Sequence, residues 1–277
     1  MFHDLHLDIY QHIFDYLPQQ DLLNLLLLRN HTFYRQIMKY IPKLLKIHDN
    51  QVLKYAARLN LIISIKFIIV SLNWNTGLHY ACFGGHIMLV KLMIKKGAND
   101  WNIALREACR GGHKILAELM IEKGAINFNL GLDGACSGGH ISIAEWMIEK
   151  GADNWDEAFE SACGNGHWAL VLLMIEKGAS HVKCGFNQAC KGGHKDIVNL
   201  MIKMGADNWN RGLFNACQGG HIDIIEMMIK RGANDWNNSL LDACKYGHKT
   251  VARLMIEKGA TICTYCNKSL EEHYNLL

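Results

Sequence analysis

Apolar residues recur along most of the chain with a period of 27 residues. The pair Ala-Cys begins at Ala81, Ala108, Ala135, Ala162, Ala189, Ala216 and Ala243, so every interval is 27 residues. A Gly-His pair, a Met-Ile pair and a Gly-Ala pair keep the same step through seven copies without an insertion. A repeat of this length is typical of small structural units that stack on one another.

Within one copy the apolar positions predict two helices. In the first copy Leu78, Ala81 and Cys82 lie at i, i+3 and i+4, on one face of a short helix. Two glycines follow in most copies, and the second is present in all seven, as expected for a left-handed residue that closes a helix. The next helix is apolar around most of its circumference, and a polar stripe remains at Met88, Lys91 and Lys95. Such a unit must bury its apolar surface against neighbours on both sides.

The two ends of the repeated region differ from its middle. Residues 73–262 hold the seven regular copies. Residues 49–72 align with them as a degenerate capping repeat, and residues 263–277 supply a more polar capping helix. Atypical ends of this kind close a solenoid. We therefore expect an all-α solenoid of stacked helix pairs.

The motif Ala-Cys-x-Gly-Gly-His, followed after six residues by Met-Ile-x-x-Gly-Ala, resembles the ankyrin repeat. It is most similar to the ankyrin-repeat families of giant DNA viruses of the mimivirus type. The period is 27 residues, whereas ankyrin repeats have about 33. The missing residues lie between Gly-Ala and the first helix, where ankyrin repeats carry a β-hairpin finger. The resemblance therefore implies an ankyrin-like solenoid that lacks most of the fingers, with short loops and little or no strand.

The repeated cysteines and histidines allow two interpretations. A Cys-x-x-x-His unit could supply two zinc ligands in each copy. The alternative, which we favour, is packing, because buried free cysteine behaves as a small hydrophobe and the histidine can bond to loop carbonyls. Cys263 and Cys266 form a lone CxxC pair without a second pair to complete four ligands. We expect no metal site, no cofactor and no catalytic residues.

An aromatic residue also recurs once in most copies. With Val182 substituting in one copy, this series indicates packing between loops, and a ladder on which a ligand stacks is the alternative. Its members are Trp74, Trp101, Phe128, Trp155, Trp209 and Trp236.

Positions that vary between copies indicate a binding surface. When Leu78, Ala81 and Cys82 face inward, residues 80 and 83 of the same helix point away, and residue 79 flanks them. A constant scaffold with a variable exposed row suits recognition, and by resemblance the first-helix face belongs to the concave binding surface of ankyrin proteins. The alternative is a merely solvated face. The candidate target-binding residues are Tyr80, Phe83, Arg106, Glu107, Arg110, Asp133, Glu160, Gln188, Lys191, Phe214, Gln218 and Lys245.

Residues 1–48 do not follow the repeat. Their apolar spacing predicts three short helices, of which the first ends at Pro18. The run Leu5-His6-Leu7-Asp8-Ile9, followed by Tyr16-Leu17-Pro18 and Asp21-Leu22-Leu23, resembles an F-box. An F-box binds the Skp-family linker of a cullin-type ubiquitin ligase. By resemblance that contact would use Leu5, Ile9, Ile13, Phe14 and Leu17. The alternative is that the same residues pack inward and these helices only cap the solenoid.

Charge and composition narrow the range of partners. The net charge is +3, from 29 basic and 26 acidic residues, which provides no concentrated basic face for nucleic acid. We expect no membrane span, because no apolar run reaches about 20 residues. The absence of a secretory signal, together with ten cysteines, favours the cytoplasm, that of the host cell if the chain is viral. We predict a monomeric, non-catalytic F-box/ankyrin substrate adaptor, and a plain ankyrin-repeat binding scaffold is the alternative.

Overall fold

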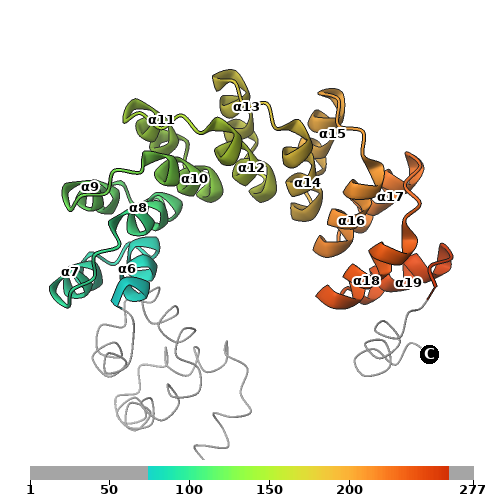
Figure 1. Cartoon of the computed structure of the whole chain (residues 1–277), viewed down its shortest axis with the longest axis horizontal. Coiled ribbons are helices and arrows are strands. Elements are labelled where there is room, and N and C mark those ends of the chain that lie inside the picture. The colour runs from blue at the N-terminus through green and yellow to red at the C-terminus, as the bar shows by residue number, and fades with distance from the viewer. Residues whose placement is uncertain (1–73, 262–277) are drawn as a thin grey trace, which may run out of the picture.

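A computed structural model describes residues 74–261, which form a curved stack of fourteen helices (Figure 1). Each 27-residue copy supplies one pair of helices, and no strand occurs between residues 74 and 261, as the short loops predict. The helices are α6 (Trp74–Phe83), α7 (Ile87–Lys95), α8 (Trp101–Arg110), α9 (Lys114–Glu122), α10 (Phe128–Gly138), α11 (Ile141–Glu149), α12 (Trp155–Asn165), α13 (Trp168–Lys177), α14 (Val182–Gly192), α15 (Lys195–Lys203), α16 (Trp209–Gly219), α17 (Ile222–Lys230), α18 (Trp236–Tyr246) and α19 (Lys249–Glu257). The F-box-like module, the degenerate first copy and the C-terminal capping helix lie outside the described residues.

The stack bends into an arch. The first helix of every pair lies on the inner side and the second on the outer side (Figure 1). First helices of consecutive copies pack directly against each other, as α8 does on α10 and α12 on α14. The variable row expected from the sequence therefore belongs to the helices that line the concave side.

The core repeats the same few contacts in every copy. In the first copy Leu78, Ala81 and Cys82 of α6 meet Leu89 and Met93 of α7, and all five are buried. All seven repeat cysteines are buried, which confirms the packing interpretation of this position. Burial raises the pKa of five of these thiols to about 12, those of Cys109, Cys136, Cys163, Cys190 and Cys217.

The repeated histidine joins each pair of helices to the preceding pair. Nε2 of His194 lies 3.1 Å from the backbone oxygen of Gly164, one copy earlier. Burial lowers the pKa of His194, which favours the neutral ring, and because a carbonyl oxygen can only accept, Nε2 is the donor. The contact recurs at His113, His167, His221 and His248. The histidine satisfies a backbone carbonyl as expected, but this carbonyl lies in the last turn of the first helix of the preceding copy and not in a loop.

The same histidine explains the obligatory second glycine. Gly166 has a φ of 80°, and a Cβ placed on it would lie 2.4 Å from Cε1 of His194. Backbone conformation and the neighbouring ring therefore both require glycine here.

A second polar contact, which the sequence analysis missed, fixes the loop between copies. Oδ1 of Asn210, the second residue of α16, accepts hydrogen bonds from the backbone amides of Asn234 and Asp235 at 2.7 and 3.1 Å. We call this contact the loop clamp. Lys183 stands at the equivalent position of α14 and has no carboxyl or amide oxygen to offer. The other copies form the clamp through Asn75, Asn102, Asn129, Asp156 and Asn237.

The recurring aromatic residue opens the first helix of its copy. Trp74, Trp101 and their equivalents are half-buried and pack against the core. The Trp209 ring also meets Phe186 of the preceding copy edge-on, with 6.3 Å between ring centroids. These contacts support the packing interpretation of the series.

Candidate protein-binding surface

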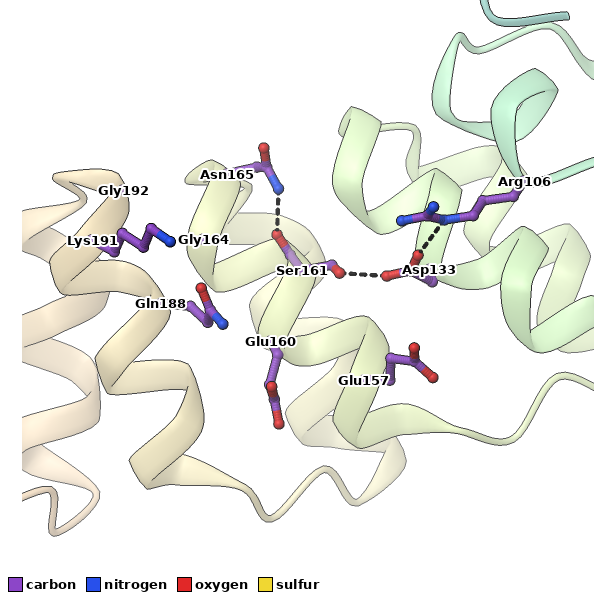
Figure 2. A pocket seen from close by; sticks show the side chains of 10 residues that line it. All are labelled: Arg106, Asp133, Glu157, Glu160, Ser161, Gly164, Asn165, Gln188, Lys191 and Gly192. Atoms are coloured by element: carbon purple, nitrogen blue, oxygen red, sulfur yellow. Dashed lines mark hydrogen bonds and ion pairs between the residues drawn. The ribbon is translucent and has the colours of Figure 1, made fainter. Parts of the chain in front are cut away.

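A hollow of about 520 Å³ opens where α8, α10, α12 and α14 line the inner side of the arch (Figure 2). Five of the predicted target-binding residues line it, namely Arg106, Asp133, Glu160, Gln188 and Lys191. The rest of the lining comes from Glu157, Ser161, Gly164, Asn165 and Gly192. Residues from four copies, far apart in the sequence, therefore form one concave site.

Asp133 forms the floor of the hollow rather than its rim. It is only 4% exposed, so it does not offer the accessible side chain expected of a target-binding residue. Nε of Arg106 donates to Oδ2 of Asp133 at 2.7 Å, and the Ser161 hydroxyl donates to Oδ1 (Figure 2). The reason is the neighbouring Gly134, where a Cβ would lie 2.2 Å from the backbone oxygen of Arg106. Because α8 and α10 approach so closely, the Asp133 side chain is enclosed between copies.

The sides of the hollow carry accessible groups of both charges. Gln188 and Lys191 of α14 are exposed and point toward α12 (Figure 2). Glu157 and Glu160 of α12 add two carboxylates. Lys191 can donate hydrogen bonds and the carboxylates can accept them, so the hollow offers donors and acceptors of both charges.

The other seven candidates are spread along the inner helices outside this hollow. At the N-terminal end the Arg110 guanidinium lies 5.4 Å from the Phe83 ring centroid and 3.9 Å from Glu107. Toward the C-terminal end Phe214 lies under the Arg211 guanidinium, at 5.0 Å. The remaining three are Tyr80, which packs half-buried on the core, Gln218, which donates to Asp242, and Lys245, which lies over Tyr246.

The variable row is less uniformly exposed than its spacing predicts. Asn215 and Asp242, at the position equivalent to Tyr80, are each 7% exposed. Asn215 donates to the backbone oxygen of Arg211 at 2.8 Å, and Asp242 accepts from Gln218 at 3.2 Å. Asn215 therefore bonds within its own helix and Asp242 joins two adjacent copies, and neither side chain faces solvent. Glu157 and Asn165 were missed for a different reason, because one lies in the first helical turn and the other replaces a helix-ending glycine.

None of the helices between residues 74 and 261 combines the length and apolar character needed to cross a bilayer.

Comparison with known proteins supports the repeat assignment. A family model described as ankyrin repeats in three copies matches residues 186–266, and one described as ankyrin repeats in many copies matches residues 71–121. Among curated proteins, no relative matches the chain significantly. The crystal structure of the human ASB11 ankyrin repeat domain is similar to 67% of this chain and 99% of its own, with 21% identity and a TM-score of 0.43. Both matched segments are built from the 27-residue unit that also fills the stretch between them. The chain therefore carries ankyrin repeats.

Proposed function

We propose that this chain is a non-catalytic adaptor that binds a target protein on the inner face of its ankyrin solenoid. Ankyrin repeats are protein–protein interaction scaffolds, typically without catalytic activity, which supports this class of function. The observation that carries the proposal is the hollow at α8, α10, α12 and α14, where exposed groups of both charges surround a fixed polar floor.

The second part of the proposal concerns a ligase partner that binds the N-terminal residues. The F-box-like residues 1–48 would dock on the Skp-family linker of a cullin-type ubiquitin ligase, in the cytoplasm, while the solenoid holds the target. The order of the two modules along the chain supports this arrangement. The second candidate is a plain binding scaffold in which residues 1–48 only cap the first copy.

Charge substitutions separate the adaptor from the plain scaffold. Ile9→Asp and Phe14→Asp in the full chain should abolish binding to a purified Skp-family linker while leaving the melting temperature unchanged. If these residues instead cap the solenoid, the same variants lower the melting temperature. Failure of the unsubstituted chain to bind the linker would refute the adaptor.

Matched charge substitutions on an inner and an outer helix test whether the target binds the inner face. Lys191→Glu inverts an exposed charge at the hollow, and Lys230→Glu makes the same change on the outer helix α17. Proteins captured by the full chain and identified by mass spectrometry should be lost with Lys191→Glu and kept with Lys230→Glu. Equal retention by both variants would show that the target binds elsewhere.

A further inference from the structure

The junction between α12 and α14 departs from the repeat at several positions at once. Asp156 stands where five other copies have Asn, and His181 stands where the preceding copies end in Asn or Asp. No other copy has a cysteine at the position equivalent to Cys184. With Glu160, these substitutions place a carboxylate, an imidazole and a thiol in a single junction, although the packing of the repeat requires none of them.

The side chains converge. Nδ1 of His181 lies 3.2 Å from Oε1 of Glu160, and the ligand atoms of Glu160, His181 and Cys184 all lie within 4.8 Å of one another. Two ligands bound at about 2.0–2.3 Å to one tetrahedral ion are about 3.3–3.8 Å apart. The Glu160–His181 pair, at 3.2 Å, is just short of this spacing. His181 and Cys184 are exposed, so a small side-chain rotation can bring the sulfur closer.

Asp156 holds the other side of the imidazole. Its Oδ1 accepts hydrogen bonds from the backbone amides of Ser180 and His181, so this carboxylate is fixed by the loop clamp. Its Oδ2 lies 3.5 Å from Nε2 of His181. A carboxylate at the far nitrogen of a ligating histidine is the usual arrangement in metal sites, because it keeps the proton on that nitrogen and turns the free lone pair toward the ion.

We propose that Glu160, His181 and Cys184 bind a zinc ion, with Asp156 as the outer carboxylate that orients the histidine. Thiolate and imidazole ligands favour zinc over magnesium or calcium, which take oxygen ligands. Three protein ligands leave the fourth position to water. The ion would join α12 to the start of α14.

This site differs from the sequence expectation of no metal. That expectation considered the repeated Cys and His and the CxxC pair, whereas Cys184 and His181 are unrepeated and come together only in the folded chain. In the absence of metal, direct contacts of the His181 ring with the Glu160 and Asp156 carboxylates account for the same two distances. Direct measurement of metal binding distinguishes the two arrangements.

The experiment uses the full chain with Cys263→Ser and Cys266→Ser, so that the CxxC pair cannot contribute. Zinc is titrated by calorimetry, and cobalt is used as a probe because a cysteine ligand produces a thiolate-to-cobalt absorption band. We expect one ion per chain, the cobalt band, and a rise in melting temperature on adding zinc.

Other copies supply matched variants. His181→Asn and Asp156→Asn introduce residues that the repeat carries at the same positions, so the fold and the clamp are kept. His181→Asn and Cys184→Ser should each weaken zinc binding more than tenfold, and Asp156→Asn about 10–100-fold. Cys184→Ser should also remove the cobalt band. Absence of saturable zinc binding, or unchanged affinity in Cys184→Ser, would overturn the proposal.

Discussion

Asn210→Ala removes one loop clamp and tests whether this contact stabilises the stack. The Asn210 side chain accepts hydrogen bonds from the backbone amides of Asn234 and Asp235. A hydrogen bond of this kind contributes about 0.5–1.5 kcal/mol net, and water can replace part of it in an exposed loop. Alanine also favours the helix over asparagine by up to about 0.7 kcal/mol. The two effects oppose each other, and the clamp is the larger, so we expect a net loss of about 1 kcal/mol.

The measurement combines global and local stability. Urea unfolding followed by circular dichroism should show a lower free energy of unfolding for Asn210→Ala. Amide hydrogen exchange at residues 234 and 235 should become faster, while amides within α16 change less. Asn210→Asp is the control, because Asp156 forms the same clamp in another copy. Unchanged exchange at both amides in Asn210→Ala would refute the reasoning.

Further predictions concern the junctions, the floor of the hollow and the thiols. Gly166→Ala should destabilise the chain more than Gly178→Ala in thermal unfolding, because both glycines have positive φ but only Gly166 meets a neighbouring ring. Asp133→Ala should cost about 2 kcal/mol in urea unfolding, because Arg106 and Ser161 lose their shared partner; an unchanged midpoint would contradict the bonding described above. Lys183→Asn should raise the urea midpoint by adding the missing clamp. Stability should fall as the pH rises above about 9, where unfolded thiols ionise while the buried ones, with pKa values near 12, stay protonated. A smaller fall in stability when Cys109 and Cys190 are replaced by Ala would confirm its origin, and an unchanged fall would contradict it.

The helix pairs and their buried faces followed from the sequence because each copy repeats the same short-range pattern. Leu78, Ala81 and Cys82 face the core as their spacing predicts. Because the second glycine is present in all seven copies, the sequence also indicated that it is obligatory. The sequence did not show the cause, which is a histidine ring of the next copy that fills the space beside the glycine. Contacts that repeat leave a periodic signal, and such a signal can be interpreted without coordinates.

Contacts that occur only once in the stack leave no periodic signal. Asp133 is polar and variable, and its burial depends on the close approach of α8 and α10 at Gly134. His181 and Cys184 are three positions apart in the sequence, but Glu160 joins them only after two copies have stacked. The loop clamp was predictable in principle, because an Asn or Asp at the second position of the first helix recurs in six of the seven copies. It was overlooked because asparagine near a helix start is also a common capping residue.

In the bond that joins two copies, the histidine donates to a backbone oxygen, which every residue possesses. This bond therefore forms between any two copies without a matching side chain in the preceding one. A gene built from such units can gain or lose whole copies by unequal recombination and still encode a continuous stack. Side-chain contacts between copies do not share this freedom: the Arg106–Asp133–Ser161 bonds and the Glu160–His181–Cys184 group each survive only while their copies remain adjacent and in this order.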